Sequence, residues 1–98
     1  MSNIKNFDHV SLAVNNLKSG IYFYSNVFEY KKIFEEENMT KQIQSITGLQ
    51  KVSCNIAQLK SDVMDNTLEL IEFKNYQNIQ KKISYPVYPG CAHIGFIV

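Results

Sequence analysis

The chain has 98 residues, of which 45% are hydrophobic, and this size fits one small domain with a single hydrophobic core. The net charge is +1, and all the basic residues are lysines spread along the chain, which disfavours a nucleic-acid partner. No stretch approaches the roughly 20 apolar residues of a membrane span, and the first residues lack the apolar run of a signal peptide. We therefore expect a cytoplasmic protein that binds neither nucleic acid nor membranes.

The first predicted elements are a strand and a helix. Residues from Phe7 to Val14 alternate, so that one face carries valine and leucine while the other carries His9, Ser11 and Ala13. After a capping asparagine, Asn15 or Asn16, an apolar stripe recurs with helical spacing and is suited to covering a sheet. The stripe consists of Leu17, Ile21, Tyr24 and Phe28.

A second strand begins at Tyr30 to Phe34 and runs into Glu35 to Glu37, a charge run typical of a solvated edge strand. Residues 38–48 are polar and predict a loop or a short helical turn that Gly48 closes. Residues 51–60 alternate again, and the Asp- and Asn-rich turn over 61–66 leads into a strand over 67–73. In this last strand Glu69 shares a face with isoleucine and phenylalanine, opposite the leucines.

Residues 75–90 are polar and contain both prolines, which favours a linker, and residues 91–98 then predict one more strand. The order β-α-β-β-β, linker, β indicates an α+β fold. We expect a βαβββ module over residues 1–74 with a largely antiparallel sheet, the linker over 75–90, and the first strand of a truncated second module over 91–98. The helix covers one face of the sheet and leaves the other face open.

The last predicted strand repeats the first one with a histidine on the same face. His9, Glu69 and His93 are therefore candidate ligands of a divalent metal: zinc, nickel, cobalt, iron or manganese. The alternatives are ordinary ones, since a single strand histidine or glutamate more often lies at a solvated surface. Glu72 is the competing carboxylate, on the helix-covered face, where solvent or a lysine is the expected partner. Cys91 shares the face of His93 but fits a small buried residue better.

Five stretches together resemble the vicinal oxygen chelate superfamily, which includes glyoxalases, bleomycin-resistance proteins and dioxygenases. They read DHVSLAV, NLKSGIYFYSNVFEY, ITGL, TLELIEF and PGCAHIGFIV. The closest resemblance is to glyoxalase I and methylmalonyl-CoA epimerase. The resemblance implies paired βαβββ modules that form a cup around a metal, with ligands at the positions of His9, Glu69 and His93. It also implies a small-molecule substrate and a homodimer.

Two features depart from that pattern. Glu29 stands where the family has a glycine after the helix, so the left-handed cap must be made otherwise. The sequence stops at Val98, within the first strand of the second module, before the fourth ligand that the family usually supplies as a glutamate on its last strand. We therefore expect a partial chain, or one whose site a second copy completes.

The resemblance implies a metal-dependent lyase or isomerase that moves a proton next to a carbonyl and stabilises an enediolate or enolate. Glu69 would act as a ligand and as the catalytic base. The first alternative is a metal-free protein that binds a drug or metabolite in the cup, as bleomycin-resistance proteins do. The second alternative is an extradiol dioxygenase or a thiol transferase for fosfomycin. For the dioxygenase, His9, His93 and a later glutamate would form the iron site, and Glu69 would be in excess.

Overall fold

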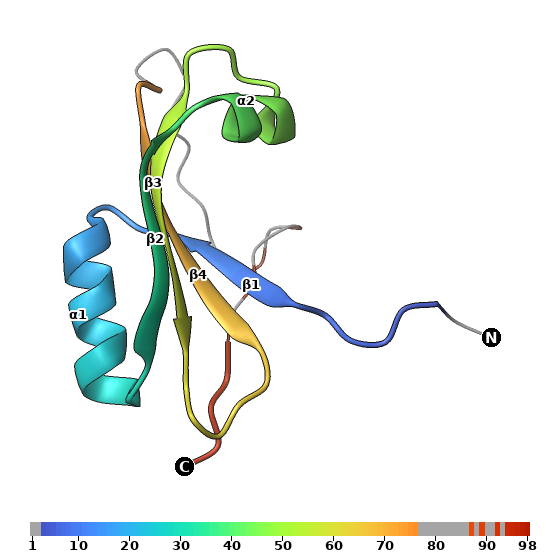
Figure 1. Cartoon of the computed structure of the whole chain (residues 1–98), viewed down its shortest axis with the longest axis vertical. Helices are drawn as coiled ribbons and strands as arrows, with labels where there is room; N and C mark the ends of the chain where they lie inside the picture. Colours follow the sequence, from blue (N-terminus) through green and yellow to red (C-terminus); the bar gives the residue numbers. More distant parts are fainter. Residues whose placement is uncertain (1–2, 77–86, 88, 90–91, 93) are drawn as a thin grey trace.

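The computed structural model describes residues 3–76, 87, 89, 92 and 94–98, and these form an α+β unit around one sheet. In chain order the elements are β1 (His9–Ala13), α1 (Leu17–Phe28), β2 (Lys31–Met39), α2 (Lys41–Thr47), β3 (Ser53–Lys60) and β4 (Thr67–Lys74). The strand order is β1-β4-β3-β2, in which β1 runs parallel to β4 and the other neighbours are antiparallel. The prediction of a βαβββ module with a largely antiparallel sheet is confirmed. Figure 1 shows α1 and α2 on opposite sides of the sheet.

Two side chains fix the beginning of α1. The Asn16 side chain accepts a hydrogen bond from the backbone N–H of Ser19 at 2.9 Å, as an N-cap residue does. The carboxylate of Glu72, far along the chain, accepts another from the backbone N–H of Leu17 at 2.8 Å. A negative charge at a helix N-terminus is favourable because the first N–H groups have no partner inside the helix. Glu72 thereby ties α1 to β4.

The end of α1 shows how the chain does without the expected glycine. Glu29 itself adopts the left-handed conformation, with φ of 61°, and caps the helix. This conformation costs a residue with a Cβ about 1–2 kcal/mol more than it costs glycine. The helix therefore ends in the predicted place, at the cost of local strain.

The main core lies between α1 and the sheet. Its buried residues come from the helix, the position just before β2 and the central strands: Leu17, Tyr30, Ala57, Leu59, Leu68 and Leu70. Gly20 lets the helix approach closely, because a Cβ at this position would lie 3.1 Å from Cδ1 of Leu70. The helix stripe and the leucine face of β4 meet here as predicted.

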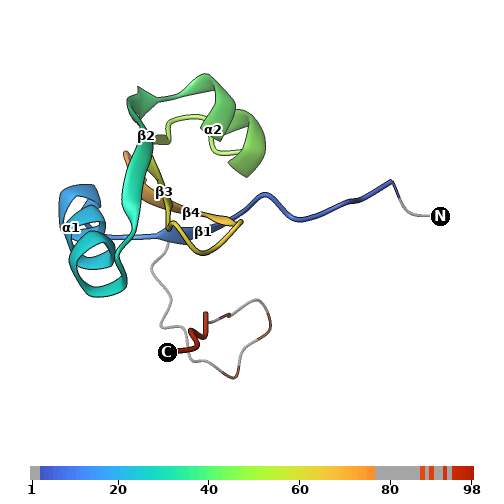
Figure 2. The ribbon, with the colours of Figure 1, turned by 60° about the horizontal axis from the view of Figure 1, so that its bottom comes forward.

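Among the described residues, α2 covers one end of the other face of the sheet (Figure 2). A second cluster of buried residues lies there: Ile43, Val52, Cys54, Ile56 and Ile71. The helix ends at Gly48, whose φ of 74° is left-handed, so the predicted helical turn closed by Gly48 is confirmed. The expectation of a fully open face needs correction, because α2 forms a wall over part of it.

The described residues of the C-terminal segment, 92 and 94–98, are not in a strand, unlike the strand predicted over 91–98. A strand needs a hydrogen-bonded neighbour, and the pairings of β1 to β4 do not include this segment. Instead, the ring of Phe96 stacks on Phe28 of α1, with ring centroids 4.5 Å apart. The division at 74 and 90 stays a prediction, since most of residues 75–91 lie outside the described part. No helix among the described residues has the length and hydrophobicity to cross a membrane.

Candidate functional site

The centre of the candidate site is the carboxylate of Glu69, in the middle of β4. The register of the sheet places Ser11 of β1 on one side of this residue and Gln58 of β3 on the other. The Ser11 hydroxyl donates to Oε1 at 2.6 Å, and the Gln58 amide donates to Oε2 at 3.0 Å. The residue is 7% exposed. Two neutral donors thus hold a buried carboxylate in one orientation.

His9 stands beside this carboxylate, at the start of β1. Its Nε2 lies 3.7 Å from Oε1 of Glu69, and its Nδ1 lies 2.9 Å from Oδ2 of Asp8. When the Asp8 carboxylate accepts the Nδ1–H of a neutral ring, Nε2 is left with its lone pair on the side of Glu69. The imidazole is partly exposed, so this lone pair is within reach of a ligand from solvent.

These side chains line a cavity of about 590 Å³ on the face of the sheet opposite α1. Polar groups of β1, β3 and β4 and the Glu36 carboxylate of β2 form one part of its wall, while α2 and apolar strand residues form the rest. The lining residues are His9, Ser11, Phe34, Glu36, Met39, Gln42, Ile43, Ile46, Thr47, Ile56, Gln58, Glu69, Ile71 and Phe73. The volume lies within the range of small-molecule binding sites.

The donor set of His9 and Glu69 fits a divalent metal as two of its ligands. Two ligand atoms at zinc-ligand distances and a tetrahedral angle lie about 3.4 Å apart, and the observed separation of Nε2 and Oε1 is 3.7 Å. Each carboxylate oxygen accepts one hydrogen bond and keeps one more acceptor position. Within the described part of the chain, no group of three or more histidine, cysteine, aspartate or glutamate side chains is arranged to hold a metal ion. The predicted ligand His93 lies outside that part.

The other cysteine and glutamate side chains that could compete as metal ligands are placed differently from His9 and Glu69. Cys54 is fully buried, and burial raises the pKa of its thiol, as do the nearby carboxylates of Glu69 and Glu36, which disfavours the thiolate that metals bind. Glu72 points to the other face and caps α1, so its partner is a backbone N–H and not the expected solvent or lysine. Cys91 lies outside the described residues.

The hydrogen-bond partners of Glu69 could not be predicted from the sequence. Alternation places Ser11 on the face of His9, but a serine alone gives no signal for a carboxylate partner. Gln58 becomes visible as a partner only once the pairing of β3 with β4 is known. Asp8 directly precedes His9 in the sequence, and this adjacency is the one feature that could have predicted the contact between the Asp8 carboxylate and the imidazole ring.

Comparison with known proteins identifies the fold. No family model matches the sequence, and no curated protein is significantly similar to it. Among solved structures, a glyoxalase family protein from Bacillus cereus matches with a TM-score of 0.68 and 20% sequence identity, over 98% of this chain. The chain spans 62% of the length of that protein. The chain therefore has the fold of the glyoxalase family, that is, the vicinal oxygen chelate fold.

Proposed function

We propose that this chain supplies part of a divalent-metal site for a lyase or isomerase that moves a proton next to a carbonyl. The observation that carries the proposal is the buried Glu69 carboxylate, fixed by Ser11 and Gln58 and placed 3.7 Å from Nε2 of His9, at the wall of a cavity. The likeness to a glyoxalase family protein supports the same class of site through the fold.

His9 and Glu69 would hold the metal, with His93 as the third predicted ligand. The metal, when bound, would act as a Lewis acid toward the carbonyl oxygen. The chain's own residues then have separate tasks. Glu69 keeps an acceptor position that can take a proton, and Ser11 and Gln58 hold its oxygens in place during the transfer. Asp8 orients the His9 ring through Nδ1.

The remaining ligands are proposed to come from beyond the described residues. The superfamily pattern closes its cup with a second module, and we propose that a second module or a second copy of this chain does so here. Light scattering of the purified protein tests the homodimer directly. A particle with the mass of one chain at all concentrations would contradict it.

The test of the metal site is binding of Zn²⁺, Ni²⁺, Co²⁺ and Mn²⁺, measured by calorimetry and by metal analysis after dialysis. We expect one metal per site, and loss of binding in His9→Ala and Glu69→Ala. Glu37→Gln, which removes an exposed carboxylate from β2, is the control and should bind as the wild type does. Deuterium uptake from D₂O next to the carbonyl of 2-hydroxy ketones, followed by NMR, then tests the proton transfer.

A metal-free binding protein is the second candidate, because both oxygens of Glu69 already have neutral hydrogen-bond donors. Under this alternative the carboxylate shapes a pocket that sequesters a drug or metabolite. The same calorimetric experiment separates the two functions. Failure of all four metals to bind the full-length protein would favour the binding protein.

A further inference from the structure

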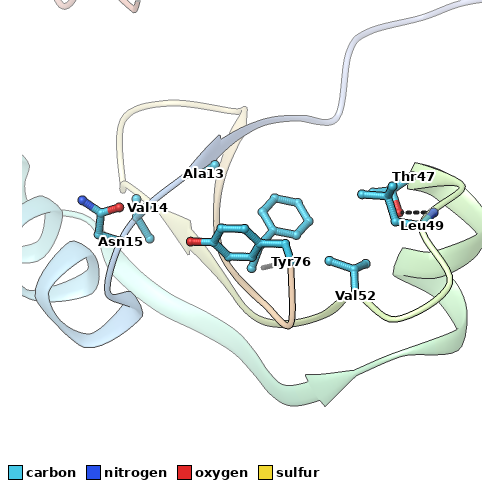
Figure 3. A pocket seen from close by; sticks show the side chains of 8 residues that line it. Ala13, Val14, Asn15, Thr47, Leu49, Val52 and Tyr76 are labelled. Atoms are coloured by element: carbon cyan, nitrogen blue, oxygen red, sulfur yellow. Dashed lines mark hydrogen bonds between the residues drawn. The ribbon is translucent and has the colours of Figure 1, made fainter. Parts of the chain in front are cut away.

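A second pocket, of about 320 Å³, adjoins the candidate site at the end of the sheet near α2 (Figure 3). Its lining comes from the end of β1, the loop after α2 and the end of β4: Ala13, Val14, Asn15, Thr47, Leu49, Val52, Phe73 and Tyr76. Thr47 and Phe73 line both this pocket and the larger cavity that contains Glu69. The two hollows are therefore neighbours with a shared wall.

The walls of this second pocket suit an uncharged, apolar group. None of its lining residues is charged, and most of the side chains are aliphatic or aromatic. The Thr47 hydroxyl is already used, since it donates to the carbonyl of Ile43 and accepts from the backbone N–H of Leu49. Asn15 and the Tyr76 hydroxyl lie toward one side of the pocket in Figure 3. An ion here would lose its hydration without a partner charge, whereas a hydrocarbon group would gain by burial.

The strands set the distance between the two ends of the combined site. His9, Ser11 and Ala13 follow one another on the same face of β1, and Glu69, Ile71 and Phe73 do so on β4. Four residues along a strand span about 13 Å. A ligand that reaches from the Glu69 carboxylate into the second pocket is therefore elongated, with a polar end and an apolar end separated by several bonds.

We propose that the second pocket binds the apolar tail of the substrate, and that the substrate is an uncharged carbonyl compound with a medium-length alkyl or arylalkyl chain. The carbonyl end would lie at His9 and Glu69, so this inference rests on the proposed function. The side chains of Thr47 and Phe73 form part of the wall of both hollows, so the tail pocket lies directly beside the cavity.

Two vicinal diones serve as probes, since they share the same polar end and differ in chain length: 2,3-decanedione and 2,3-butanedione. Affinities are measured by NMR titration of the full-length protein, with and without Zn²⁺. We expect the long dione to bind at least about tenfold more tightly, because its chain is buried on binding. Its shifts should be largest at the lining residues Val52 and Tyr76.

Two variants of the pocket test the location. Ala13→Phe fills the pocket from an exposed position on β1, and Tyr76→Ala removes a wall that is half exposed, so neither empties the core. Each should remove most of the chain-length preference and leave the affinity for 2,3-butanedione within about twofold. Tyr22→Ala, on the outer side of α1, is the matched control and should change neither affinity.

The outcomes separate this inference from the proposed function. Equal affinities for the two diones, or an unchanged preference in both pocket variants, would overturn the tail pocket whether or not metal binds. If the preference persists and depends on Ala13 and Tyr76 while His9→Ala, Glu69→Ala and Zn²⁺ have no effect on either dione, the tail pocket stands and the metal site fails. Loss of affinity for both diones in His9→Ala, with the preference kept, supports both.

Discussion

Glu69 and Glu72 are three residues apart on β4, so they lie on opposite faces of the sheet, where they have different partners. Glu72 accepts a hydrogen bond from the first backbone N–H of α1, a group that has no partner within its own helix. Glu69 accepts from two side chains, and its carboxylate borders a cavity. Glu72 thus anchors a helix on one face of the sheet, and Glu69 borders the cavity on the other.

The two faces differ in packing as well. On the α1 side, Leu59, Leu68 and Leu70 are at most 3% exposed and form a continuous apolar layer. On the cavity side, the row formed by Ser11, Glu69 and Gln58 places polar groups in the middle of the sheet. This difference predicts that stability depends mainly on the first face and binding on the second.

The largest expected effect on stability is that of Leu70→Ala. Leu70 is fully buried between α1 and the sheet, so the substitution should leave a closed cavity and lower the free energy of unfolding by about 4 kcal/mol. Ile71, the next residue, faces the cavity side, where water can fill the space that Ile71→Ala leaves. This substitution should lower the free energy of unfolding by about 2 kcal/mol. Urea denaturation of both variants measures the difference. Equal losses would show that the two faces support the fold equally.

Glu72→Ala should have the next largest effect. It removes the carboxylate that caps α1, and we expect a loss of about 1–2 kcal/mol in the free energy of unfolding, with metal affinity unchanged. Glu72→Gln keeps an acceptor oxygen and should restore about half of the loss. Glu37→Ala on β2 is the exposed control. A change in metal affinity in Glu72→Ala would contradict the separation of the two faces.

Local features of the fold could be predicted from the sequence, whereas contacts between distant parts of the chain could not. Alternation assigned the faces of β1 and β4 correctly, and Gly48 marked the end of α2, because these features depend on neighbours in the chain. The pairing of Glu69 with Ser11 and Gln58 depends on strand order and register, and the contact between Glu72 and Leu17 joins elements 55 residues apart. No periodicity encodes such contacts. His93 stays a predicted ligand, outside the described residues.

Glu29→Gly should stabilise the protein modestly. Glycine removes the strain of the left-handed conformation at φ of 61°, although it adds conformational freedom to the unfolded chain, so we expect a net gain of about 0.5–1 kcal/mol. Glu29→Asn should fall between the two, since asparagine tolerates this conformation. Thermal unfolding measures the change. Because Glu29 lies at the end of α1 and does not line the cavity, metal affinity should not move.

The smallest change in stability is expected for Glu69→Gln. Glutamine has the same size, and its amide can donate to the Ser11 hydroxyl while its carbonyl accepts from Gln58, so both hydrogen bonds persist with one direction reversed. The substitution also removes a buried charge, which offsets any loss in geometry. We therefore expect the free energy of unfolding to stay within about 0.5 kcal/mol, while Zn²⁺ affinity falls about tenfold or more, because a neutral amide is a weaker ligand than a carboxylate. Denaturation and calorimetry on the same preparation measure both quantities. A loss of stability comparable to that of Glu72→Ala, with Zn²⁺ affinity unchanged, would mean that both carboxylates of β4 serve the fold.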